Sequence, residues 1–309
     1  MSPRHPALPY AAFIALALIW GVSFLLIKVA VQDMSPAALL FFRTTSGFAA
    51  LALILLVWRR RLFESEWRGF VFSFAFMAVT NAVIPWISIA WGEERISSGL
   101  ASILNSTTAL WTAVLIYWVM PSERPSFVNY VGVLIGFAGV VVLVYPDIAA
   151  HGLTGDVLGA LAVVVASLSY SVNALYQRRK MRHVSVFDVS LGQLAAGVII
   201  AVPIAATSLP HVHFQVVSMA AVIALGAFGT GVAYLLYYYV MNTLGAVRAA
   251  GVTFLVPVTA VFWGVVLLHE TLSVPLLAGM IVILTGIVLT NLRRRGPQKA
   301  AIEAESAAA

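Results

Sequence analysis

Polar and aromatic side chains recur at helical spacing inside stretches that are otherwise apolar. Asn105 and Thr108 stand three positions apart, as do Tyr170 and Asn173, so each pair shares one face of a helix. Amides, hydroxyls and aromatic rings bind small solutes by hydrogen bonding and stacking. The candidate binding residues are Trp20, Asn81, Trp86, Asn105, Thr108, Trp111, Tyr170, Asn173, Tyr234, Tyr237 and Tyr238. The competing interpretation is hydrogen bonding between helices, which contributes about 0.6 kcal/mol on average.

Arg43 is a charged residue deep inside an apolar run, about seven residues and so about 10 Å from the start of that run. An arginine at the centre of a bilayer costs about 2.5–3.5 kcal/mol or more. Three interpretations stay open: Arg43 reaches back to the outer headgroups, pairs with Asp33 or Glu270 as an outer gate, or contacts a substrate carboxylate. Arg43 and Glu270 are therefore the candidate gate or charge residues.

The sequence lacks the residues on which the common catalytic and metal sites are built. It has no cysteine, which excludes disulfides, thiolate metal sites and cysteine nucleophiles. The patterns Gly-x-Ser-x-Gly and His-Glu-x-x-His and a Walker motif are absent, and the histidines are scattered. We therefore predict no catalytic residues, no metal, no cofactor and no enzymatic activity.

The composition is that of an integral membrane protein. Hydrophobic residues make up 61% of the chain and charged residues 10%, whereas a soluble protein carries about 25% charged residues. The net charge of +6 comes from short basic clusters between apolar runs, which argues against nucleic acid as a partner. Membrane lipid and a small-molecule substrate are the expected partners.

Apolar runs of about 20 residues are long enough to cross a bilayer as helices. Such runs predict an all-α integral membrane protein with ten transmembrane helices. The first run is read as a membrane helix rather than a signal peptide, because its charge-free stretch is long and no convincing cleavage site follows. The predicted spans are residues 10–30, 36–58, 69–92, 97–119, 126–145, 156–177, 187–208, 215–241, 248–268 and 272–292.

The distribution of basic residues predicts the orientation of these spans. With the N-terminus in the cytoplasm, 15 of the 18 lysines and arginines fall in cytoplasmic segments, as membrane proteins prefer. Lys28 and Arg95 then lie on the outer side, together with the acids Asp33, Glu93 and Glu94. We therefore predict a multi-pass protein of the cell (inner) membrane with both termini cytoplasmic.

The two halves of the chain resemble each other, with matching residues at constant offsets. At an offset of 147, Glu123, Ser126, Gly132 and Gly139 match Glu270, Ser273, Gly279 and Gly286. This predicts one five-helix repeat over residues 10–145, a second over 156–292, and a polar cytoplasmic tail over 293–309. Because five is odd, the second repeat enters the membrane from the opposite side and the two repeats are inverted.

The run from Trp20 to Phe24, and the Glu-x-x-Ser followed by spaced glycines in both halves, resemble the EamA-type branch of the drug/metabolite transporter superfamily. The resemblance covers about residues 10–292. It implies a central cavity lined mainly by spans 1, 3, 4, 6, 8 and 9, and efflux of small metabolites, with a general similarity to exporters of aromatic or neutral amino acids. The first half departs from the pattern, since Ala109 stands where the second half has Pro257, and this puts a shared helix break in doubt for span 4.

We therefore expect a secondary transporter that exports small metabolites, amino acids foremost, by alternating access, as a monomer or weak dimer. The acidic residues fall in loops or at helix ends, so we expect net flux to follow the substrate gradient. The alternatives are a proton-driven multidrug efflux carrier and, from another class, a membrane channel. Inverted repeats with polar residues at membrane depth favour alternating access over the channel.

The orientation can be tested with single cysteines, because the natural chain has none. A cysteine replacing Asp147 should react with an impermeant maleimide added outside intact cells, since this residue falls in a predicted outer segment. A cysteine replacing Arg60 should stay unlabelled until the cells are permeabilised. The reverse pattern would invert the assignment.

Overall fold

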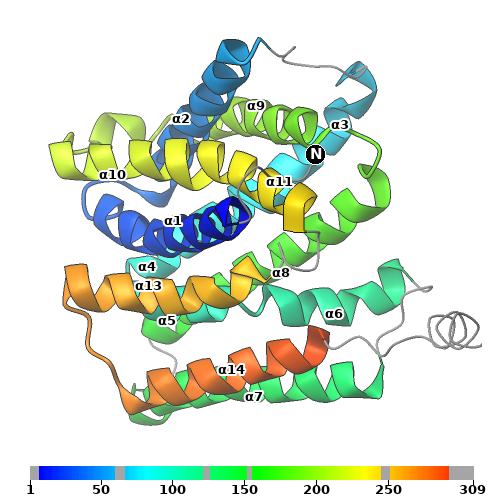
Figure 1. The fold of residues 1–309 in the computed structure, drawn as a ribbon. Coiled ribbons are helices and arrows are strands. Elements are labelled where there is room, and N and C mark those ends of the chain that lie inside the picture. Colours follow the sequence, from blue (N-terminus) through cyan, green and yellow to red (C-terminus); the bar gives the residue numbers. More distant parts are fainter. Residues whose placement is uncertain (1–6, 60–66, 121–125, 152–154, 245–250, 292–309) are drawn as a thin grey trace, which may run out of the picture.

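The structure is a computed structural model that describes residues 7–59, 67–120, 126–151, 155–244 and 251–291, and in these ranges the chain is helical with no β-strand. The predicted polar tail, Glu123 and the basic cluster at 60–61 lie outside the described residues. Figure 1 shows the helices stacked in rows that run in roughly the same direction across the molecule. An all-α architecture is what the bilayer requires, since a helix satisfies its backbone hydrogen bonds internally.

Most predicted spans are single helices or nearly continuous pairs of helices. In chain order the α-helices are α1 (Leu8–Ala30), α2 (Pro36–Val57), α3 (Val71–Ala78), α4 (Ile84–Glu93), α5 (Ser98–Asn105), α6 (Thr108–Val119), α7 (Phe127–His151), α8 (Gly155–Lys180), α9 (Val186–Ala205), α10 (Val216–Gly226), α11 (Ala233–Leu244), α13 (Val252–Leu268) and α14 (Val274–Asn291). The described chain also has short 3-10 turns at Trp67–Phe70 and Leu209–His211.

Within the described ranges, eight helical segments are long and apolar enough to cross a membrane. They coincide with the first eight predicted spans. Two shorter apolar helices, Val252–Leu268 and Val274–Thr290, lie at the last two predicted spans. The chain is therefore a multi-pass membrane protein, and ten crossings remain a prediction for these two shorter helices.

Serine caps begin several of the helices. Ser35 precedes Pro36, and its side chain accepts a hydrogen bond from Ala38 N at 3.3 Å. Ser97 does the same for Leu100 N at 3.2 Å at the start of α5. A serine cap satisfies one of the free N–H groups at a helix start, and proline fits the first helical turn because it has no N–H to satisfy.

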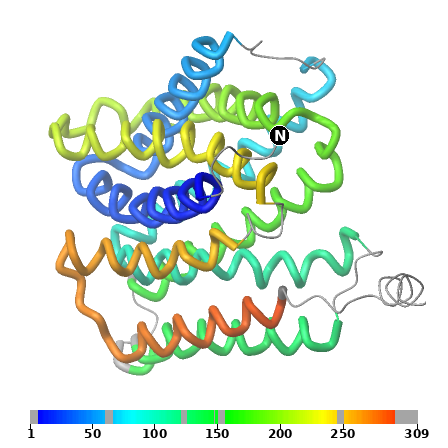
Figure 2. The backbone as a smooth tube through the Cα atoms, viewed as in Figure 1, coloured from blue at the N-terminus to red at the C-terminus, as the bar shows by residue number. Residues whose placement is uncertain are grey.

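Contacts between a helix of one half and a helix of the other have counterparts in which the two halves are interchanged. A two-fold relation between the halves produces this arrangement. The first span α1 packs on α13 of the ninth, and its counterpart α8 packs on α5 and α6 of the fourth. The two last spans of the halves, α7 and α14, pack on each other and lie side by side along one edge of the molecule (Figures 1 and 2). The second spans α2 and α9 also pack on each other.

The third span of each half contains a π-helical segment at the same place. These segments are Val79–Val83, between α3 and α4, and Ala227–Val232, between α10 and α11. A π-helical segment inserts one residue into a helix and occurs frequently at functional sites. The repeat inferred from glycines and glutamates thus extends to an irregularity of the backbone that the sequence did not indicate.

Pro257 suggested a helix break in the ninth span rather than in the fourth, and the structure has the reverse. Helix α13 runs through Pro257 without interruption, whereas the fourth span breaks between α5 and α6 although Ala109 stands in place of the proline. The hydroxyls of Ser106 and Thr107 bond to carbonyls three residues earlier, both at 2.6 Å. Side chains that compete for main-chain carbonyls in this way weaken or bend a helix.

Carbonyls at this break are satisfied by α8. Ser167 Oγ donates to the carbonyl oxygens of Leu104 and Asn105 at 3.1 and 3.3 Å, and Ser171 Oγ donates to that of Thr108 at 2.7 Å. Irregular backbone at membrane depth is tolerated where neighbouring helices supply such partners. The packing of the fourth span against α8 therefore stabilises the break.

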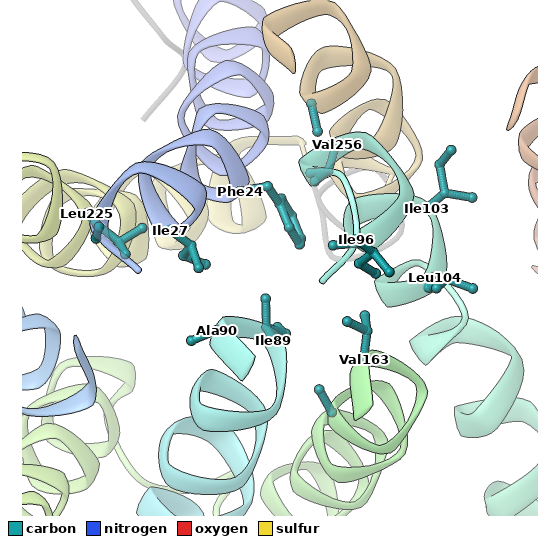
Figure 3. Close-up of a cluster of buried hydrophobic side chains, with 14 of the residues drawn as sticks. Phe24, Ile27, Ile89, Ala90, Ile96, Ile103, Leu104, Val163, Leu225 and Val256 are labelled. Carbon is teal, nitrogen blue, oxygen red and sulfur yellow. The ribbon is translucent and has the colours of Figure 1, made fainter. Parts of the chain in front are cut away.

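The core lies where the central helices meet. Figure 3 shows Phe24 and Ile27 of α1, Ile89 of α4, Ile96 of the following turn and Val163 of α8 converging on one space. Large side chains such as Phe72, Ile199 and Val216 point outwards and are more than 70% exposed. An apolar outer surface of this kind matches lipid, which is the solvent of a membrane protein.

Close approach of α7 and α14 depends on glycine. A methyl group on Gly286 would lie 2.5 Å from Gly136 Cα and 2.6 Å from Gly132 O, so the two helices would have to separate. We expect Gly286→Ala to destabilise the protein by about 1–3 kcal/mol through overpacking. Thermal unfolding in detergent measures this loss. Gly69→Ala is the control, because nothing lies within 4 Å of its new methyl group, and equal stability of the two variants would contradict the prediction.

Candidate functional site

Three polar side chains from three different spans meet at the first π-helical segment. Asn81 Nδ2 donates to Gln193 Oε1 at 3.1 Å and to the Tyr234 hydroxyl oxygen at 3.2 Å. Gln193 Nε2 also reaches the Tyr234 hydroxyl at 3.4 Å. Asn81 comes from the third span, Gln193 from α9 and Tyr234 from α11. We call Arg43, Asn81, Trp86, Tyr170, Gln193 and Tyr234 the central cluster.

Arg43 of α2 is the charged member of the central cluster. Its side chain is buried, with 7% exposed, and its guanidinium carbon lies 3.9 Å from the centre of the Trp86 ring. Tyr170 and Tyr234 pack against the same apolar residues as Trp86. The guanidinium is therefore buried over an aromatic ring rather than placed at the membrane surface.

Two of the three interpretations of Arg43 do not match this geometry. The side chain does not reach the outer headgroups, because it is buried. It does not pair with Asp33 or Glu270, since the ion pair among the described residues joins Arg95 to Glu94. Asp33 instead accepts a hydrogen bond from the Ser218 hydroxyl. Contact with a substrate carboxylate stays a prediction.

Arg43 also lacks full compensation for its burial. Its Nε is buried without a hydrogen-bond partner. A desolvated stack on tryptophan contributes about 2 kcal/mol, which offsets only part of the cost of taking a charge out of water, several kcal/mol per ion. A guanidinium in this position is a ready donor for an anionic group that arrives with a ligand.

Helix α8 links the central cluster to the break in the fourth span. On the cluster side, Asn173 Oδ1 accepts from Thr80 Oγ1 at 3.4 Å, and Ser169 Oγ donates to the carbonyl oxygen of Thr80 at 2.8 Å. On the side of the break, Ser167 and Ser171 hold α5 and α6 as described above. Asn173 belongs to the polar face predicted for this helix, whereas the bonds of Ser167 and Ser171 come from residues that were not predicted.

The break itself carries two unsatisfied polar groups from the predicted set. Asn105 Oδ1 and Trp111 Nε1 are buried and have no hydrogen-bond partner. The Trp111 ring packs edge-on against Phe137 with centres 4.8 Å apart. Thr108, by contrast, is used locally, because its hydroxyl donates to the carbonyl of Asn105 at 2.8 Å. Buried polar atoms without partners are uncommon and mark places where a ligand or water completes the bonding.

The remaining predicted residues lie apart from these bonds. The Trp20 and Tyr237 rings contact each other with centres 5.6 Å apart, which joins α1 to α11. Tyr238 packs on Phe187 at 4.9 Å and lines a groove with Trp58 and Asn242. Glu270 caps α5 from the far half of the chain, accepting from Ser98 N at 2.7 Å and Gly99 N at 3.1 Å.

Two open grooves of about 240 Å³ each lie on the described chain, one between α13 and α14 and the other beside Tyr238. The first has an entirely apolar lining that includes Phe262 and Leu272, both about half exposed. No residue of the central cluster lines either groove. Within the cluster, Arg43, Trp86 and Gln193 are buried, and the other three residues are partly exposed.

Comparison with known proteins follows this geometry. The model of the EamA-like transporter family matches residues 7–145 and 157–292. The chain belongs to the EamA-like transporter family. Among curated relatives, an uncharacterized transporter of Archaeoglobus fulgidus is 26% identical over 89% of this chain and 95% of its own length. The uncharacterized transporter YoaV of Bacillus subtilis is 22% identical over 90% and 94%.

A third relative of this EamA-like transporter is the uncharacterized inner membrane transporter YedA of Escherichia coli K12, 27% identical over 92% of this chain and 90% of its own. A solved crystal structure with 21% sequence identity matches with a TM-score of 0.66, covering 93% of this chain and 97% of that chain. That likeness shows the fold. Family membership and the names of these relatives support a membrane transporter.

Several residues of this EamA-like transporter's polar interior were not among the predicted site residues, and they include Gln193, Thr80, Lys28 and Glu93. The rule that selected Asn81, an amide inside an apolar run, would also have selected Gln193. Lys28 and Glu93 were assigned to the outer side as loop or helix-end charges. Their burial depends on how α1, α4 and α5 meet, which no sequence pattern here indicated.

The tyrosine hydroxyl of the central cluster offers a sharp test of the site in this EamA-like transporter. Tyr234→Phe removes the oxygen that accepts from Asn81 and Gln193, leaving buried donors unpaired at a cost of about 1–3 kcal/mol. We expect transport to fall by about tenfold or more with unchanged membrane expression. Tyr145→Phe, on the exposed surface of α7, is the matched control and should transport normally. If the Tyr234→Phe variant also transports normally, these hydrogen bonds serve helix packing and not transport.

Proposed function

We propose that this protein is a secondary transporter that exports small metabolites bearing a carboxylate, with aromatic or neutral amino acids as the main class. It works by alternating access, in the inner membrane, where its relative YedA is placed by name. The observation that carries the proposal is the buried guanidinium of Arg43, stacked on Trp86 and without an acidic partner.

The central cluster provides a separate feature for each part of such a solute. The Arg43 guanidinium offers donors for the carboxylate, and charge-assisted bonds of this kind are the strongest available to it. Trp86, Tyr170 and Tyr234 offer aromatic surface for an apolar side chain. Asn81 and Gln193 supply amide oxygens and N–H groups that accept or donate according to what the solute presents.

The fold supports alternating access through its two related halves. The exchange of helix pairs, with α1 on α13 and α8 on α5 and α6, provides two equivalent ways to close the molecule, one at each end. The central cluster draws on α2, the third span, α8, α9 and α11, and therefore on both halves. A continuous channel does not need two related halves, so the repeat favours a carrier.

The role of Arg43 is tested by removing its charge and by removing the charge of the solute. Counterflow into proteoliposomes should be fast for phenylalanine and slow for phenylalanine amide, which lacks the carboxylate. Arg43→Gln should lose about 10–100-fold in rate for phenylalanine, the equivalent of about 1.5–3 kcal/mol for a bond to a charged group. It should lose little for the amide, so the preference between the two solutes disappears.

Arg68→Gln is the matched control, because Arg68 also faces a tryptophan, Trp67, at 5.9 Å, but is exposed. This variant should keep the preference of the natural protein. If Arg43→Gln also keeps it, the guanidinium does not contact the carboxylate. If no amino acid of a labelled panel is moved by the natural protein, the proposed substrate class is wrong.

A further inference from the structure

Glu93 is a buried acid at the end of α4 that takes no part in the central cluster. Its side chain is 0% exposed, and both carboxylate oxygens are buried without a hydrogen-bond partner. The neighbouring residue Glu94, in contrast, is exposed and pairs with Arg95 at 2.8 Å. The sequence placed both acids on the outer side, and only the packing separates them.

The helix ends around Glu93 close one end of the molecule, which we call the outer end. It is formed by the end of α1, the end of α4, the start of α5 and the end of α13. Figure 3 shows that Phe24 of α1, Ile89 of α4 and Ile96 of the turn before α5 belong to one cluster of apolar side chains. By the distribution of basic residues this end faces away from the cytoplasm.

The charged groups around Glu93 are already engaged elsewhere. Lys28 of α1 donates through Nζ to the backbone carbonyls of Glu93 and Ile96, the latter at 2.9 Å, and forms no ion pair with the carboxylate. The Glu270 carboxylate, from the segment after α13, is compensated by two N–H groups at the start of α5. Arg43 of α2 is held over Trp86.

The other elements packed on α4 and α5 bring no counter-charge to Glu93. From α8, Gly159 packs against Gly92, and the acid at the start of that helix, Asp156, is exposed. The groups that act on Glu93 electrostatically are therefore Lys28, Arg43 and Glu270.

An ionised carboxylate cannot remain in this place at low cost. Taking an ion out of water costs several kcal/mol unless a partner and hydrogen bonds compensate it, and Glu93 has neither. A neutral carboxylic acid is far cheaper to bury. A metal ion is a poor alternative occupant, because it needs several oxygen ligands and would lie near two cations; the described residues hold no cluster of acids or histidines that could bind one.

We propose that Glu93 is a proton-binding site coupled to the outer end of the transporter. The carboxylate takes up one proton from water as the outer end closes over it, and the carboxylic acid returns that proton to water when the end opens. The proposal rests on the alternating-access carrier proposed above but not on its substrate. It adds a pH response to the carrier and leaves the direction of net flux to the substrate gradient, because the proton returns to the side from which it came.

The sign of the pH effect follows from proton counting. The closed outer end holds one more proton than the open one, so raising the pH favours opening. For one proton the ratio of open to closed molecules rises by up to tenfold for each pH unit over the range in which the two states differ in protonation. Glu93→Gln mimics the protonated acid and should keep the outer end closed at every pH.

Opening can be measured without knowing the substrate. A cysteine replacing Ile96, which is 6% exposed at the outer end, is labelled with an impermeant maleimide in proteoliposomes between about pH 5 and about pH 8. Its rate is divided by that of a cysteine replacing Phe214, which is 72% exposed, so that the reactivity of the thiol itself cancels. We expect the ratio to rise about tenfold or more with pH.

In the Glu93→Gln background the ratio should stay low and flat, whereas Glu93→Asp should restore the rise. Glu94→Gln is the matched control and should behave as the natural protein. A cysteine replacing Val261 in α13 is a second reporter, which can be used if the variant with a cysteine in place of Ile96 does not fold. If the ratio still rises with pH in Glu93→Gln, or does not rise in the natural protein, Glu93 is not the proton site. Neither result depends on whether amino acids are the substrate.

Discussion

The absence of water in the bilayer core is the constraint on which the rest of this structure depends. Each polar group inside the bundle must find its partner in the protein, because no solvent can replace a missing bond. Ser167 and Ser171 donate hydrogen bonds to carbonyls of the broken fourth span, and Glu270 accepts a hydrogen bond from the start of α5. Among the described residues, eight carry a buried polar atom without a partner, and Arg43, Glu93, Asn105 and Trp111 are four of them.

These exceptions fall into a pattern that suits a carrier. Arg43 is a buried cation of the central cluster without an acidic partner among the described residues. Glu93 is a buried acid of the outer end that is costly to ionise. A solute carboxylate bound to Arg43 and a negative charge on Glu93 would compete for the same positive charge, so substrate and proton influence each other through ordinary Coulomb interaction.

The backbone irregularities lie beside these groups. The π-helical segment at Val79–Val83 presents Asn81, and the break after α5 presents Asn105. At both places the regular backbone hydrogen bonding of a helix is interrupted. In each case a serine hydroxyl of α8 donates to a backbone carbonyl there. Deviations that the packing must support in this way are typical of sites where function needs a particular geometry.

The sequence by itself determined the helical class, the positions of the helices and the relation between the halves, because apolar run length and glycine spacing are local properties. It also selected Asn81, Trp86, Tyr170 and Tyr234, since polar groups at membrane depth are few. Tertiary structure alone decided which of them meet, that Arg43 stacks on Trp86, and that Glu93 is buried while Glu94 is exposed. Those outcomes depend on contacts between helices far apart in the chain, and one helix cannot show which of its neighbours will cover a side chain at its end.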